Sequence, residues 1–305
     1  MLHNINTGWN KLVSDFNVFL KLEKILSQNS IDAYISDVKK LKSFFEVIGK
    51  DIKPTEVKLS DLKHFIEWIN KLGMSSGTQA RVISGIKGFY KYLLLEDIIQ
   101  TDPTALLESP RRGRKLPDIL SVEEIDKIMA AIDLSKPQGQ RNKAILETLY
   151  SCGLRVSELT NLKISNLYFD LGYVKILGKG SKERLVPISS RAIKEINLYF
   201  EDRRRLSSVA KEDENIVFLN RRGKKLTRVM VFTIVKELVQ KINLRKNVSP
   251  HTFRHSFATH LIDGGADLRA VQEMLGHESI LTTEIYTHLD REYLRDTIIR
   301  FHPRS

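Results

Sequence analysis

Residues 173–188 read YVKILGKGSKERLVPI, and this stretch decides the fold class. Two short runs of mainly β-branched and apolar residues, 173–177 and 184–188, flank a turn that contains two glycines. Such runs around a glycine turn are typical of a β-hairpin. A further short strand is predicted at 216–219, ahead of a basic turn. Because helical patterns precede and follow the hairpin, the sequence predicts a mainly α-helical protein with one small β-sheet in its second half.

Apolar residues recur at helical spacing through the first 108 residues, without any strand-like alternation. Polar breaks at 27–30, 50–54 and 73–77 divide this part into four predicted helices, followed by a short terminal segment. After residue 117, the stretch from Leu120 to Glu124 has the serine and glutamate spacing of a capping box, which predicts the start of another helix.

Between these two parts lies SPRRGRKLP, residues 109–117. Its prolines, its glycine and its cations predict an extended linker. We therefore expect a helical domain at 1–108 and a second domain at 118–305. The linker cations fit either a solvated loop or a strap that lies along phosphates, and they are Arg111, Arg112, Arg114 and Lys115.

The charge of the chain is concentrated in its second part. The 305 residues carry 49 Lys and Arg against 37 Asp and Glu, which gives a net charge of +12. The first 110 residues hold 14 basic and 13 acidic side chains, and the rest of the chain holds 35 and 24. A basic excess is common in soluble proteins, but one confined to part of a chain also favours a polyanionic partner such as nucleic acid.

Several protein classes are excluded by composition. Cys152 is the only cysteine, so neither an intrachain disulfide nor a cysteine zinc cluster can form. No apolar stretch approaches the roughly 20 residues that span a bilayer, and the first residues lack the pattern of a signal peptide. We expect a soluble cytoplasmic protein that does not bind a membrane.

Four clusters of polar residues are candidates for chemistry. Arg155 and Glu158 are three residues apart at a predicted helix start, where they form either a surface ion pair or a carboxylate-held arginine that faces a phosphate. His251 and Arg254 repeat this spacing. Tyr286 follows in a stretch where a lone tyrosine is usually structural.

The fourth cluster lies at the tip of the predicted hairpin, and the histidines allow a second interpretation. Lys179 stands between two glycines at the hairpin tip, where a lysine is usually solvated, although the glycines allow close approach to a ligand. His251, His255 and His260 could be read as a zinc set, but the stretch lacks the glutamate of the H-E-x-x-H motif.

Together these clusters resemble the tyrosine recombinases, and most closely the bacterial Xer type, over nearly the whole chain. The resemblance is carried by GLRVSEL at 153–159, GKGSKERLVPI at 178–188, HTFRHSFATHL at 251–261 and MLGHESILTTEIYTHL at 274–289. It implies a two-domain DNA clamp. The active-site residues that it implies are Arg155, Lys179, His251, Arg254, His277 and Tyr286.

The implied reaction is transesterification on DNA. The phenol of Tyr286 attacks a phosphodiester, forms a 3′-phosphotyrosyl bond and releases a 5′-hydroxyl, and a hydroxyl of the partner duplex reverses the step through a Holliday junction. Neither ATP nor a metal is required, because the covalent intermediate keeps the bond energy. The arginines would clamp the non-bridging oxygens and His277 would donate to one of them.

The remaining roles concern protons and position. His251 would take the phenol proton or orient the site, Lys179 would protonate the leaving oxygen, and Glu158 would hold Arg155. Glu284 departs from the glutamine that many relatives carry at this position, and we assign it no role.

The resemblance also implies partners. Xer-type enzymes work as tetramers on two DNA duplexes, as homotetramers or with a second recombinase, and a cell-division DNA translocase is a further expected partner. The helix at 289–301 would dock on a neighbouring protomer, or else on its own domain. DNA contacts of the first domain are expected from a local basic face, namely Lys39, Lys42, Arg81 and Lys87.

The expected role is the resolution of chromosome dimers at a dif-like site during chromosome segregation. The alternative is an integrase of a mobile element with the same chemistry. A silent DNA-binding accessory protein is disfavoured by the complete set of six residues, and a relaxing topoisomerase by the compact two-domain layout.

Overall fold

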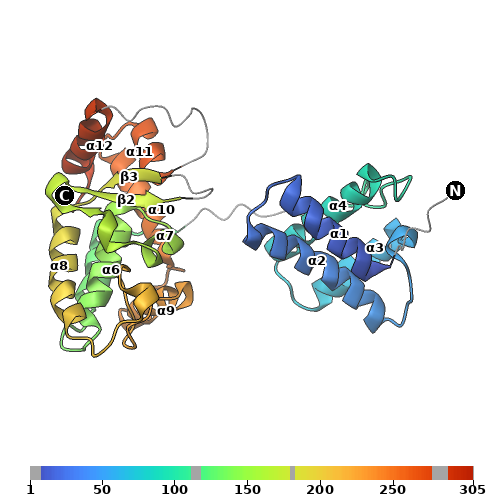
Figure 1. The fold of residues 1–305 in the computed structure, drawn as a ribbon, viewed down its shortest axis with the longest axis horizontal. Coiled ribbons are helices and arrows are strands. Elements are labelled where there is room, and N and C mark those ends of the chain that lie inside the picture. Colours follow the sequence, from blue (N-terminus) through green and yellow to red (C-terminus); the bar gives the residue numbers. More distant parts are fainter. Residues whose placement is uncertain (1–7, 111–117, 179–182, 277–287, 305) are drawn as a thin grey trace. The chain divides into compact units, whose positions relative to one another are not determined.

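The computed structural model describes residues 8–110, 118–178, 183–276 and 288–304, with side chains from residue 292 onward in the last stretch. The chain divides into two compact units, Met1–Lys115 and Leu116–Ser305, and each is described by itself (Figure 1). Residues 111–117, which hold the four cations of the predicted linker, lie outside the described residues. Within the described ranges, no helix has the length and apolar character needed to cross a membrane.

The N-terminal unit is helical, as the sequence predicts. Its helices are α1 (Trp9–Leu22), α2 (Gln28–Val47), α3 (Leu59–Lys71) and α4 (Ser76–Leu95). Helix α2 crosses α4 closely because two glycines of α4 face it. A Cβ atom at Gly85 would lie 2.8 Å from the Cβ of Asp37, and one at Gly88 would lie 2.9 Å from the ring of Tyr34. Phe16 and Phe89 are fully buried at the centre of the resulting core.

The C-terminal unit is also mainly helical and contains the small sheet. Its helices are α5 (Val122–Ala130), α6 (Gly139–Cys152), α7 (Val156–Thr160), α8 (Ser190–Arg204), α9 (Arg228–Lys241), α10 (Pro250–Asp263), α11 (Leu268–Leu275) and α12 (His288–Phe301). The predicted capping box begins α5, where Ser121 and Glu124 each accept a hydrogen bond from the backbone N–H of the other.

The sheet has three antiparallel strands in the order β1 (Leu167–Tyr168), β2 (Tyr173–Leu177) and β3 (Glu183–Pro187). Tyr173 pairs with Pro187 and Leu177 with Glu183, which confirms the predicted hairpin. Strand β1 escapes prediction because two residues are too few to show an alternating pattern.

The strand predicted at 216–219 is wrong. Ile216 and Leu219 form only isolated bridges to other segments. Side chains from α8 occupy backbone groups that a strand partner would need: Arg203 donates to the carbonyl of Ile216 over 3.1 Å, and the hydroxyl of Tyr199 accepts from the N–H of Leu219 over 3.1 Å. Apolar composition alone does not reveal this competition.

Helix α6 is the buried axis of the C-terminal unit, and it packs against both α8 and α10. It ends at Gly153, which adopts the left-handed conformation with φ +56°. A Cβ atom at Gly153 would clash with the ring of Phe257 on α10 and would lie 3.1 Å from Leu275 on α11. Only glycine therefore lets the chain turn beneath these two helices and continue into α7.

The C-terminal helix α12 packs against α10, α11 and β3 of its own unit, with Leu294 and Ile298 buried. Two residues after it, His302 and Arg304, are also buried. His302 is 3% exposed and contacts the ring of Tyr150, and Arg304 forms an ion pair with Glu147 at 3.1 Å. The predicted exchange of this helix between protomers would have to replace these contacts, and it stays a prediction.

Replacing Gly153 with alanine should destabilise the C-terminal unit by about 2–4 kcal/mol, because left-handed backbone strain adds to the clash with Phe257. Gly172→Ala is the matched control in the same unit. Its φ is +74°, but its Cβ would meet Arg295 only at an ordinary 3.4 Å, so about 1 kcal/mol is expected.

Calorimetry of the full chain measures both variants. Trp9 and Trp68 are the only tryptophans, so their fluorescence identifies the transition of the N-terminal unit, which neither variant should shift. Equal destabilisation by the two substitutions would contradict the proposed packing beneath α10.

His302 should make the C-terminal unit less stable in acid. Burial lowers its pKa to about 4, below the value of about 6.5 for an unfolded chain. The folded state favours the neutral ring. The contribution of His302 to the free energy of unfolding is therefore fully present above pH 6.5, and it is lost as the pH falls towards 4. Its upper limit is about 3 kcal/mol. His302→Gln should therefore flatten the dependence of urea unfolding on pH between 7 and 4, whereas substitution of the exposed His255 should not.

Candidate active site

Four of the residues predicted for the site lie within the described part of the C-terminal unit: Arg155, Glu158, His251 and Arg254. Lys179, His277 and Tyr286 lie outside the described residues, so their placement stays a prediction. The described four come from the start of α7 and the first two turns of α10. At Gly153 the chain passes against Phe257 of α10 and then continues into α7, so these two elements lie close together.

Arg155 and Glu158 form the pair that their spacing predicts. The guanidinium Nη1 of Arg155 lies 2.9 Å from Oε1 of Glu158, and the backbone N–H of Arg155 donates to Oε2 over 2.9 Å. The second guanidinium nitrogen, Nη2, donates to the carbonyl of Gly276 over 3.2 Å. The side chain of Arg155 remains 36% exposed, so its guanidinium is both held in place and open to a ligand.

Arg254 is more deeply buried, with 8% exposure. Its Nη1 donates to the carbonyl of Gly153 over 2.7 Å, and its Nη2 donates to that of Leu275 over 2.5 Å. Burial, with the nearby charge of Arg155, lowers the pKa of Arg254 to about 10. The guanidinium is therefore still cationic at neutral pH, and its charge is only partly offset by Glu158 at 3.9 Å.

His251 stands in the first turn of α10 and faces solvent. Partial burial, then the charge of Arg254, lowers its pKa below the usual range of histidine. The imidazole is therefore neutral at pH 7, the form that can accept a proton. Within the described residues no three His, Cys, Asp or Glu side chains converge as a metal site. His260 stands in the last turn of α10, where it shares a 2.7 Å hydrogen bond with Tyr150.

Arg184 on β3 is a site residue that the sequence analysis missed. It is 8% exposed and binds both oxygens of Glu158, each over 2.9 Å. Its Nε donates to the carbonyl of Met274 over 3.0 Å. The signal was present in the strand alternation, because Arg184 occupies the same face as Val186 and that face points into the core. A charged residue at a core position requires a partner.

Glu158 is the group that these arginines share. It is 6% exposed. Burial raises its pKa, but hydrogen bonds and charge from Arg184, with those from Arg155, outweigh that effect and keep the pKa low. The carboxylate is thus ionised at neutral pH. Three guanidinium groups surround one carboxylate, so the cluster carries an excess of positive charge suited to a phosphate.

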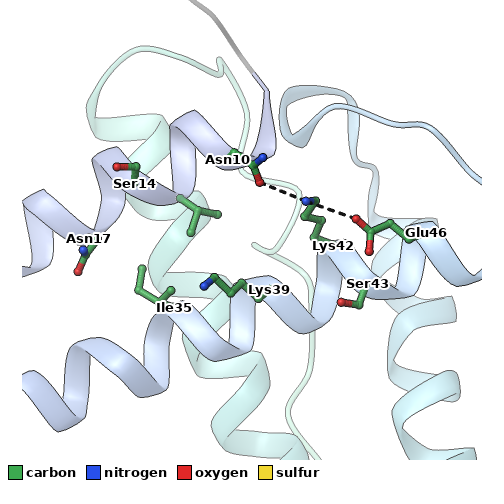
Figure 2. Close-up of a pocket in the computed structure, with 9 residues that line it drawn as sticks. Asn10, Ser14, Asn17, Ile35, Lys39, Lys42, Ser43 and Glu46 are labelled. Carbon is green, nitrogen blue, oxygen red and sulfur yellow. Dashed lines mark hydrogen bonds and ion pairs between the residues drawn. The ribbon is translucent and has the colours of Figure 1, made fainter.

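The cations predicted to contact DNA in the N-terminal unit differ in whether they form ion pairs. Arg81 forms an ion pair with the buried Asp37. Lys42 contacts Asn10 at 3.1 Å and Glu46 at 3.3 Å, while Lys39 lines the same pocket of about 440 Å³ between α1 and α2 (Figure 2). Neither Lys39 nor Lys87 forms an ion pair with any residue that the structure describes. Their contact with DNA stays a prediction.

Comparison with known proteins identifies the family of the chain. The phage integrase family matches residues 118–292, and its N-terminal SAM-like domain matches residues 13–97. The chain is 38% identical to tyrosine recombinase XerD of Listeria monocytogenes serotype 4b, with 97% of this chain and 100% of the relative covered. It is 41% identical to XerD of Chlorobaculum tepidum, with 97% and 98% covered.

Solved structures show the same fold. The XerH recombinase bound to a palindromic difH substrate, in a post-cleavage complex, has a TM-score of 0.70 and 25% identity, covering 93% of this chain and 83% of that one. A lambda integrase dimer bound to a core site has the same TM-score at 16% identity, with 94% and 77% covered. With an arginine cluster at the predicted motifs and close relatives over nearly its full length, the chain belongs to the phage integrase family of tyrosine recombinases.

Proposed function

We propose that this protein is a Xer-type site-specific recombinase that cuts and rejoins double-stranded DNA through Tyr286. The observation that carries the proposal is the cluster in which Arg155 and Arg254 meet around Glu158 at the end of α11. Residue 277, the next predicted site residue, follows Gly276, the C-cap of α11, in the chain. The naming of relatives at 38–41% identity as tyrosine recombinase XerD supports the same reaction.

The cluster suits the charge that develops during strand cleavage. A phosphodiester carries one negative charge, and the attacking phenoxide of Tyr286 adds a second in the transition state. Fixed guanidinium groups that donate to the two non-bridging oxygens stabilise this charge without reorganising. Removal of one such donor commonly costs about 10²–10³ in rate. In our proposal Arg155 and Arg254 are these donors.

Proton transfer completes the proposed cycle. The phenol of Tyr286 gives its proton to His251, whose low pKa keeps the ring neutral and able to accept it. The phosphorus–oxygen bond to the 5′-oxygen breaks as the 3′-phosphotyrosyl bond forms, and Lys179 protonates the leaving oxygen. His277 donates to a non-bridging oxygen. Attack by a 5′-hydroxyl of the partner duplex regenerates the tyrosine and yields the exchanged strand.

The biological setting is inferred from relatives. The XerH relative was captured on a difH substrate, so we propose that this chain acts at a dif-like site and resolves chromosome dimers. The assembly would be a tetramer of this chain, or one shared with a second recombinase, with a cell-division DNA translocase as a further partner. Integration of a mobile element remains the alternative.

Tyr286→Phe should abolish covalent attachment to DNA, because phenylalanine lacks the attacking oxygen. The substrate is a duplex nicked beside the scissile phosphate, which traps the phosphotyrosyl product; its site is first mapped by footprinting. The wild-type protein should form a covalent complex that survives denaturing electrophoresis. Tyr168→Phe, a change at an exposed tyrosine of the same unit, is the control and should keep full attachment. Covalent product from Tyr286→Phe would mean that another residue is the nucleophile.

The exchange of α12 between protomers is testable without removing the helix, whose Leu294 and Ile298 belong to the core of its own unit. Tyr293 and Ile299 are each 54% exposed on this helix. If α12 docks on a neighbour through these exposed side chains, Tyr293→Ala combined with Ile299→Asp should leave binding to a single site unchanged and reduce synapsis at least about tenfold. Gel shifts of one and two duplexes measure the two steps, and unchanged synapsis would refute docking through these side chains.

A further inference from the structure

We propose that Arg184 is a positioning residue for DNA cleavage: by binding both oxygens of Glu158, it leaves the charges of Arg155 and Arg254 available to the scissile phosphate. The inference rests on the proposed function, and it concerns a residue that touches neither the phosphate nor the nucleophile in that mechanism. Arg184 would act through Glu158 and through the end of α11.

The hydrogen bonds of Glu158 show the division of its charge. Oε1 accepts from Nη1 of Arg155 and from Nη1 of Arg184, each over 2.9 Å. Oε2 accepts from the backbone N–H of Arg155 and from Nη2 of Arg184, again over 2.9 Å. With Arg184 in place each oxygen has two donors, and Arg254 stays at 3.9 Å.

Loss of Arg184 would change both the charge and the geometry. The three guanidinium groups and one carboxylate carry a net charge of +2, and removal of Arg184 lowers this to +1. Each oxygen of Glu158 would also lose one donor. A buried carboxylate with free lone pairs attracts the nearest cations, so Arg155 and Arg254 would move towards Glu158 and away from a phosphate.

Arg184 also helps to hold the end of α11. The last carbonyls of a helix lack partners within the helix and lie at its negative end. Here three consecutive carbonyls each accept from a different arginine: Met274 from Nε of Arg184 at 3.0 Å, Leu275 from Nη2 of Arg254 at 2.5 Å, and Gly276 from Nη2 of Arg155 at 3.2 Å. The same three arginines thus surround Glu158 and fix the residues that precede position 277.

The approach of Arg184 to this helix end depends on Gly276. Its φ is +63°, and a Cβ atom there would lie 3.2 Å from the guanidinium carbon of Arg184. A lysine could supply the charge of Arg184, but its single nitrogen lacks the planar fork that here binds both carboxylate oxygens and the Met274 carbonyl. The arrangement therefore requires an arginine specifically.

A bidentate ion pair can also serve stability alone, so the test must separate positioning from folding. The variants are Arg184→Met, which removes the charge, and Arg184→Lys, which keeps it. The matched control is Arg141→Met. Arg141 is another buried arginine of the same unit, but it donates to Leu219 and Asn142 rather than to the cluster.

The readout is single-turnover cleavage of a nicked duplex that carries either the natural phosphodiester or a methylphosphonate at the scissile position. The methylphosphonate is neutral, so its cleavage depends less on the charge of the site. Release of the 5′-hydroxyl strand is measured for both. Arg184→Met should slow cleavage of the phosphodiester about 10–100-fold and that of the methylphosphonate less than about threefold. Arg184→Lys should recover part of the loss.

Arg141→Met should lower the unfolding midpoint but should not change the ratio of the two cleavage rates. The proposal is overturned if Arg184→Met slows both substrates equally, or slows neither. If the wild-type protein cleaves no DNA, the proposed function fails, and the positioning role is then judged on inorganic phosphate by calorimetry. Arg184→Met should weaken phosphate binding at least about tenfold relative to the wild type and to Arg141→Met. Equal binding by all three proteins, or no binding by the wild type, would refute it.

Discussion

The site depends on one buried carboxylate, Glu158, and on the arginines that share it. A buried charge is costly unless it is paired and hydrogen-bonded, and Glu158 meets this requirement through Arg155 and Arg184. Its pKa stays low for that reason. Because there are more arginines than carboxylates, the pairing that makes the group stable also leaves positive charge at the surface, where we propose that a DNA phosphate binds.

The scaffold is arranged so that segments far apart in the sequence meet at this group. Helix α6 ends at Gly153, whose left-handed conformation turns the chain beneath Phe257. That turn places Arg155 at the start of α7, with Arg254 of α10 bonded to the carbonyl of Gly153 itself. Arg184 reaches the same carboxylate from strand β3. A small hairpin in a helical unit therefore has a structural role, since its strand supplies a partner for the buried carboxylate.

Much of this was predictable from local patterns. The hairpin at 173–188 follows from two apolar runs around glycines, and the Arg155–Glu158 pair follows from a three-residue spacing. The prediction of a strand at 216–219 failed because backbone groups of this run form hydrogen bonds with the side chains of Arg203 and Tyr199 on α8. Arg184 could not be assigned in the same way, because the motif GKGSKERLVPI does not show which distant carboxylate pairs with a charged residue at a core-facing strand position.

The sequence by itself determined the helical class, the hairpin, the family motifs and the concentration of positive charge after residue 110. Each of these follows from the spacing or the composition of residues that are close together in the chain. Tertiary structure alone decided that Glu158 serves more than one arginine, that consecutive carbonyls at the end of α11 bind three of them, and that His302 and Arg304 after α12 are buried in their own unit. The physical reason is that these contacts join residues between 21 and 121 positions apart, or depend on burial, and no local pattern records which distant donor satisfies a buried oxygen.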